Sequence, residues 1–133
     1  MRKKVKRKLL ISVTLLSSLI MFSVSTLAST YKTWGATLSS RRNPVYLEKG
    51  NYNDNSKSVK ARVTYMGGDY NRMYFYLTTP HGEGESVMGT INVGYVSVKN
   101  APGMNSGTTV ELRGGNDKWS IVRVDAAGNV IFP

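Results

Sequence analysis

The residues best suited to acid–base or metal chemistry lie in one short segment, residues 79–85. His81 is the single histidine of the chain, and Glu83 and Glu85 follow it at alternate positions. In an extended backbone these side chains would share one side, where they could bind a metal ion or act as paired carboxylates. No second histidine or cysteine completes a transition-metal site, and calcium sites use more oxygen ligands. The flanking glycines would leave both carboxylates mobile, whereas acid–base catalysis needs one acid held in a shielded pocket. We therefore expect a polar turn with neither a metal site nor a catalytic pair of carboxylates.

Nucleophilic catalysis has no better support. A serine–histidine–aspartate site would have to be built around the same His81, and the chain has no Gly-x-Ser-x-Gly motif. We therefore expect a protein that is not an enzyme and has no cofactor or catalytic residue.

Two strands are predicted most clearly, at residues 58–66 and residues 72–79, because apolar and polar side chains alternate along both. Residues 67–71 contain two glycines and fit a hairpin loop between them. In the register that keeps one face of this hairpin apolar, Val63 opposes Phe75. The side chains expected to face the core are Val59, Ala61, Val63, Tyr65, Met73, Phe75 and Leu77.

The outer face of this predicted hairpin combines tyrosine rings with positive charges. A tyrosine offers apolar surface with a polar tip, and a neighbouring cation can stack on the ring or meet an anionic group. Such a face suits an anionic cell-envelope polymer, a glycan or a lipid headgroup, although tyrosine is also an ordinary residue of an exposed sheet. The predicted binding residues are Lys60, Arg62, Tyr70, Tyr74 and Tyr76. A second basic spot, Arg41 and Arg42, fits a solvated loop.

These segments belong to a chain that is predicted to be all-β. Further strands are expected at residues 32–38, 45–48, 87–98, 108–113, 118–124 and 129–132. The alternation changes phase near Gly94, which indicates a bulge or bend. Residues 114–117 and 125–128 are typical of tight turns that would join the last three strands as a meander. Seven or eight short strands predict a small two-sheet antiparallel sandwich, with a small barrel as the alternative.

The N-terminal segment has the pattern of an export signal. Six of the first eight residues are lysine or arginine, and no charged residue follows until Lys32. Small residues at Thr26 and Ala28 suit a signal peptidase, so we expect a signal peptide over residues 1–28 and one secreted β domain over residues 29–133. The alternative is an uncleaved membrane anchor, since the apolar stretch is nearly long enough to span a bilayer. Both alternatives place the domain outside the cell.

Charge and cysteine content narrow the partners of this domain. The formal net charge is +10, but without the first eight residues twelve basic residues face eight acidic ones, which leaves about +4. Nucleic acid is therefore not an expected partner, whereas anionic surface polymers and headgroups are. The chain has no cysteine, so its fold depends on core packing alone. This composition favours a secreted protein of a Gram-positive bacterium.

The strand pattern resembles small uncharacterised secreted proteins of Gram-positive bacteria that accompany bacteriocin export systems. The likeness lies in the cysteine-free signal segment and in residues 60–65, 73–77 and 109–113. A more distant similarity is to lactococcin-972-like bacteriocins, whose Trp-x-x-Gly motif is not matched by the adjacent Trp34 and Gly35. The resemblance implies no functional residue.

Two functions are consistent with these features. The first is a secreted binding module that acts at the cell envelope through its basic, tyrosine-rich sheet face. The alternative is a bacteriocin-like antimicrobial or toxin protein that acts on target membranes or wall precursors.

Overall fold

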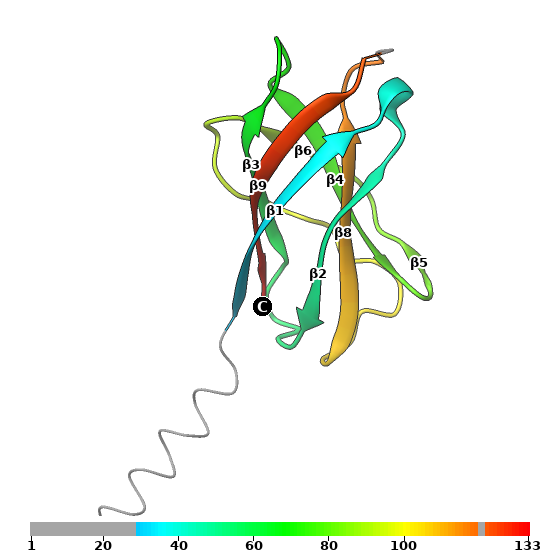
Figure 1. Ribbon diagram of the computed structural model, residues 1–133. Coiled ribbons are helices and arrows are strands. Elements are labelled where there is room, and N and C mark those ends of the chain that lie inside the picture. The colour runs from blue at the N-terminus through cyan, green and yellow to red at the C-terminus, as the bar shows by residue number, and fades with distance from the viewer. Residues whose placement is uncertain (1–28, 120–121) are drawn as a thin grey trace, which may run out of the picture.

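The chain folds into two antiparallel β-sheets that pack face to face (Figure 1). The computed structural model describes residues 29–119 and 122–133, so the predicted signal segment lies outside it. The described residues form nine strands and one short 3-10 helix, η1. In chain order these elements are β1 Thr30–Leu38, η1 Ser40–Arg42, β2 Val45–Tyr52, β3 Lys60–Met66, β4 Arg72–Thr79, β5 Gly82–Glu83, β6 Val87–Thr90, β7 Val96–Ser97, β8 Thr108–Asn116 and β9 Val124–Phe132. Within residues 29–119 and 122–133, no helix is long and apolar enough to cross a membrane.

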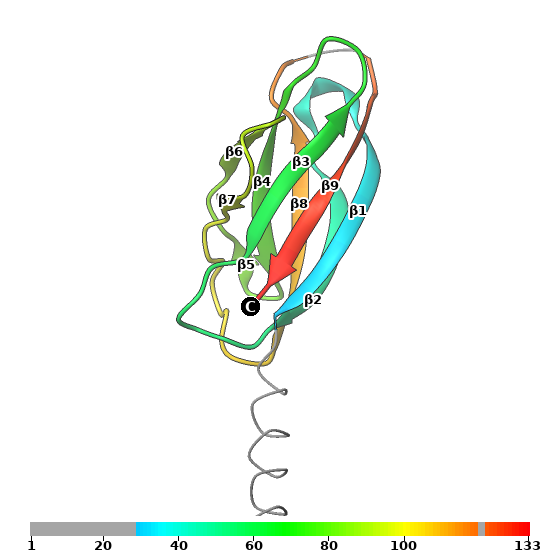
Figure 2. The ribbon, with the colours of Figure 1, turned by 90° about the vertical axis from the view of Figure 1, so that its left-hand side faces the viewer.

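The predicted all-β sandwich is confirmed, and the barrel alternative is not. Sheet A has the strand order β1-β9-β3-β7, and sheet B has the order β2-β8-β4-β5, with β6 also paired to β4. Figure 2 shows the strands of sheet A lying across those of sheet B. Every pairing between the described strands is antiparallel.

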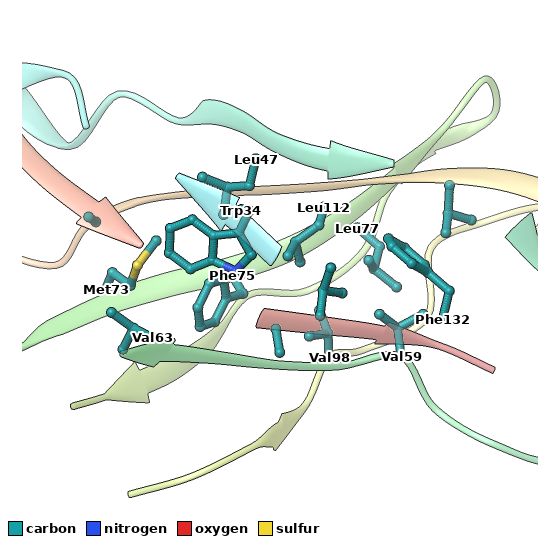
Figure 3. Close-up of a cluster of buried hydrophobic side chains, with 14 of the residues drawn as sticks. Trp34, Leu47, Val59, Val63, Met73, Phe75, Leu77, Val98, Leu112 and Phe132 are labelled. Carbon is teal, nitrogen blue, oxygen red and sulfur yellow. The ribbon is translucent and has the colours of Figure 1, made fainter. Parts of the chain in front are cut away.

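The core lies between the two sheets and receives one side of each long strand, as alternating patterns require. Trp34 of β1 and Phe75 of β4 meet edge to face across the sandwich, with ring centroids 5.9 Å apart (Figure 3). Gly128 of β9 leaves room for the indole, because a Cβ at this position would lie 2.6 Å from Cζ2 of Trp34. The core therefore depends on a pairing of tryptophan with glycine as well as on aliphatic side chains.

The predicted β3–β4 hairpin is wrong. β3 pairs with β9 and β7 in sheet A, whereas β4 pairs with β8, β5 and β6 in sheet B. Residues 67–71 therefore connect the two sheets. Val63 and Phe75 are both buried as predicted, but they face each other across the core and are not neighbours within a sheet.

The predicted C-terminal meander is also wrong. Residues 114–116 belong to β8, and residues 125–128 lie within the long strand β9, which pairs with β1 and β3. No described residue of the expected strand 118–124 before Val124 is in a strand, and residues 120–121 lie outside the described residues.

The change of phase near Gly94 has a clear structural meaning. The expected strand 87–98 divides into β6 in sheet B and β7 in sheet A. Gly94 has a φ of 91° and Asn92 a φ of 66°, both in the left-handed region. The predicted bend is therefore the point at which the chain passes from one sheet to the other.

Candidate functional site

The five predicted binding residues do not share one face. Lys60 and Arg62 lie on the outer side of sheet A, whereas Tyr74 and Tyr76 lie on the outer side of sheet B. Tyr70 lies in the connection between the sheets and packs against the core. The predicted single surface depended on a β3–β4 hairpin, and because these strands lie in different sheets that surface does not form.

Sheet A nevertheless surrounds the two cations with other tyrosines. In one row across the sheet, Tyr31 opposes Ile131, which opposes Lys60. In the next row Arg62 lies beside Asn129, and the ring of Tyr95, just before β7, lies next to the guanidinium. We call this surface the tyrosine face and define it by Tyr31, Lys60, Arg62, Tyr65 and Tyr95.

A β-bulge brings Tyr65 to the tyrosine face. The β3–β9 register shifts between Val63, which opposes Gly128, and Tyr65, which opposes Ala127. The extra residue, Thr64, reverses the alternation that predicted an inward Tyr65. Tyr65 is 56% exposed, as is Tyr31. Its assignment to the core from sequence is therefore wrong.

Arg62 is held in a fixed position on this face. Its Nε donates a hydrogen bond to Oδ1 of Asn129 at 2.8 Å, and its guanidinium carbon lies 4.7 Å from the centroid of the Tyr95 ring. No carboxylate in the described part of the chain forms an ion pair with Arg62 or Lys60. The remaining guanidinium donors are therefore available to an external anion.

Tyr95 and Tyr31 reach toward each other over the sheet. Burial raises the pKa of Tyr95, the positive charge of Arg62 opposes this shift, and a side-chain hydrogen bond with Tyr31 adds to it. The two tyrosines come from opposite edges of sheet A. Their rings add apolar area to this face, which is suited to stacking.

The outer face of sheet B is different because both of its arginines form ion pairs. Arg113 forms an ion pair with Glu111 at 3.2 Å, and Arg72 forms one with Asp117 at 2.6 Å. Tyr74 and Tyr76 stack with ring centroids 6.2 Å apart, and Tyr76 is only 7% exposed. Stacking of these two predicted binding residues thus contributes to the packing of sheet B.

The raised pKa of Tyr76 makes stability depend on alkaline pH. Burial raises the pKa of Tyr76 above its usual 10.0, and the charge of Glu83 adds to this while Arg113 opposes it. The folded state therefore keeps this proton more tightly, and its contribution to stability is complete below about pH 10 and is lost as the pH rises through the folded pKa.

Tyr76→Phe is accordingly expected to lose less stability than the parent between about pH 9 and about pH 11. Urea denaturation at both pH values measures the difference. An equal loss in the parent and the variant would contradict the raised pKa.

The segment around His81 forms an exposed turn between β4 and β5. The His81 backbone N–H donates to Oγ1 of Thr79 at 3.1 Å, and Glu83 and Glu85 are exposed. The described residues contain no group of three or more histidine, cysteine, aspartate or glutamate side chains able to hold a metal ion.

Sequence reasoning missed three tyrosines of the tyrosine face. Tyr31 and Tyr95 lie next to Arg62 and Lys60 only because β1 and β7 flank the β9–β3 pair. Tyr31 lies three residues before the buried Trp34, and Tyr95 directly precedes the partly buried Val96, which was the available signal for their outward position.

Comparisons of the chain with protein-family models, with curated protein sequences and with solved structures gave no match. Function is therefore inferred from the chemistry of the two sheet faces.

Proposed function

We propose that this chain is a non-enzymatic binding module, exported to the cell surface, whose tyrosine face binds an anionic polymer of the cell envelope. The observation that carries the proposal is Arg62, which is fixed over Tyr95 and has no acidic partner among the described residues. A positioned guanidinium beside exposed aromatic rings suits phosphate or carboxylate groups spaced along a polymer.

The arrangement of the face supports a long ligand. Its residues come from β1, from β3 and from the residue just before β7, so the face extends across β9 from one edge of sheet A to the other. With strands about 4.8 Å apart, four strands give the face a width of about 14 Å. A polymer that crosses it can meet Tyr31, Lys60 and Tyr95 with successive groups.

The tyrosine face contains no acidic residue, which supports binding without catalysis. On the same outer side of sheet A lies Asp125, whose Oδ1 accepts a hydrogen bond from Oγ1 of Thr37 at 2.8 Å. Asp125 is exposed, and so it lacks the shielded environment that a general acid needs.

Removing the cations is expected to remove most of the salt dependence of binding. Each cation near an anionic surface contributes about 1 kcal/mol, so Lys60→Ala with Arg62→Ala should weaken binding to purified envelopes about tenfold or more at low salt. At about 1 M salt the Debye length falls to about 3 Å, and parent and variant should converge. Tyr31→Ala with Tyr65→Ala should weaken binding at both salt concentrations, because stacking is screened far less.

A pull-down with purified envelopes at low and high salt measures these effects, with circular dichroism to check folding. Lys49→Ala with Lys57→Ala is the matched control, since it removes two exposed lysines that lie off the tyrosine face. Parent-like binding by both tyrosine-face variants would refute the proposal. Dye release from anionic vesicles by the parent would favour the antimicrobial alternative.

A further inference from the structure

A second surface feature lies on the opposite side of the molecule, at the end of sheet B near η1. A hollow of about 460 Å³ is lined by Arg42, Tyr74, Ser86, Met88 and Trp119. Ligand pockets in proteins commonly have volumes of about 300–1,000 Å³. Because the tyrosine face belongs to sheet A, this hollow is independent of it.

Tyr74 is the residue of β4 that lines the hollow. It opposes Gly115 of β8 on one side and Met88 of β6 on the other. A Cβ at Gly115 would lie 2.6 Å from the Tyr74 hydroxyl and 2.8 Å from Cζ, so the ring rests on the glycine. The hydroxyl donates a hydrogen bond to the Arg42 carbonyl at 2.6 Å. This hydrogen bond links Tyr74 of sheet B to the segment that carries Arg42.

Arg42, which also lines the hollow, adopts an unfavourable backbone conformation. Its φ of 60° lies in the left-handed region, which costs a non-glycine residue free energy. Its side chain is exposed, and no carboxylate in the described ranges forms an ion pair with it. The lining residues include no acid. The lining of the hollow therefore has a guanidinium without an ion pair and no carboxylate, although the charge of Glu83 also acts on Tyr74.

Trp119 supplies an unusually exposed aromatic wall. Its exposed fraction is 73%, whereas that of Trp34, the other tryptophan of the chain, is 4%. Met88, which is 38% exposed, adds further apolar surface. An open hollow with an indole, a phenol ring, a hydroxyl and a guanidinium suits a ligand that has an apolar face, hydroxyl groups and a negative charge.

We propose that this hollow binds a sugar ring that carries a carboxylate or phosphate group. The apolar face of the ring stacks on Trp119, its charged group meets the Arg42 guanidinium, and a ring hydroxyl bonds to Ser86. This function is additional to polymer binding by the tyrosine face, and it assigns single-ring recognition to sheet B.

The two tryptophans make this proposal directly testable. Emission from the exposed Trp119 should shift and saturate when the parent is titrated with glucuronate or with glucose 6-phosphate, and glucose should bind at least tenfold more weakly. Calorimetry should give the same dissociation constants, and Trp119→Phe should lose the emission change and at least tenfold in affinity. Comparable affinity for glucose and for both anionic sugars would overturn the proposal.

Arg42→Gly isolates the charge without straining the backbone, because glycine adopts a positive φ readily. This variant should keep or raise the melting temperature, bind glucuronate at least tenfold more weakly, and lose the preference over glucose. Arg123→Ala, which removes an exposed arginine outside the lining residues, is the matched control.

Parent-like affinity in Arg42→Gly would overturn the proposal, as would a Trp119 shift with anionic vesicles but with neither sugar. Tyr31→Ala with Tyr65→Ala should bind glucuronate as the parent does, which separates this site from the tyrosine face.

Discussion

Phe75→Ala is expected to lower the free energy of unfolding by about 3–5 kcal/mol, the usual cost of truncating a buried phenylalanine. Phe75 is completely buried and meets the Trp34 ring edge to face across the sandwich. Gly89 in β6 packs directly against its ring, so the surrounding backbone is already in close contact with it. A small domain has about 5–15 kcal/mol of stability in total. The variant should therefore unfold at much lower denaturant concentration or fail to accumulate.

Chemical denaturation of parent and variant gives the loss directly. Tyr65→Ala is the matched control, because it truncates an aromatic side chain that is 56% exposed and lies outside the core. Its cost should be about 1 kcal/mol or less. A larger loss for Tyr65→Ala than for Phe75→Ala would mean that the two side chains have the opposite orientations.

Most core-facing residues of β3 and β4 could be predicted from sequence, with Tyr65 as the exception, but the pairing of these strands could not. Alternation identifies the apolar side of each strand, and Val63 and Phe75 are both buried as expected. Two strands that neighbour each other in a sheet and two that face each other across a sandwich bury the same side chains. The glycines of residues 67–71 suit either connection, so the pattern did not distinguish a hairpin from a crossing between sheets.

The C-terminal turns were wrongly predicted for a different reason. Gly115 and Gly128 look like turn residues in sequence, yet both lie inside long strands. Each provides room for an aromatic ring from a neighbouring strand, Tyr74 over Gly115 and Trp34 against Gly128. Turns and close aromatic packing both select glycine, and only the partner strand distinguishes them.

The outward orientation of Lys60 and Arg62 could be predicted from sequence, but the tyrosines beside them could not. Lys60 and Arg62 point outward because their own strand alternates. Which tyrosines lie beside them depends on long-range pairing, since β9 separates β3 from the edge strand that carries Tyr31. Tyr65 depends in addition on a bulge, which changes the side of the sheet without changing the composition of the strand.

Gly128→Ala is the second change with a large expected effect, because it acts on the core and on the tyrosine face together. The added Cβ would lie 2.6 Å from Cζ2 of Trp34 and would also meet the Arg62 carbonyl oxygen. The indole could rotate away, but the carbonyl belongs to the paired strand and can move only with it. Overpacking of this kind costs about 1–3 kcal/mol, and we expect about 3 kcal/mol because backbone must move.

The position of Gly128 extends this effect to binding. It opposes Val63, the last residue before the bulge that turns Tyr65 outward. A shift of β3 away from β9 should therefore displace Tyr65 and Arg62, so that the folded fraction of Gly128→Ala binds envelopes less tightly than the parent.

Gly35→Ala is the matched control for this prediction. Gly35 lies in the neighbouring strand β1, and a Cβ there would have Ala126 O as its nearest neighbour, at 4.0 Å. The free energy of unfolding of Gly35→Ala should differ from that of the parent by about 0.5 kcal/mol or less. Urea denaturation and the envelope pull-down, performed on both variants, measure the two effects.

Equal stability of Gly128→Ala and Gly35→Ala would show that Trp34 and the bulge tolerate the added methyl group. Lower stability with parent-like binding by the folded fraction of Gly128→Ala would show that the tyrosine face does not depend on the bulge.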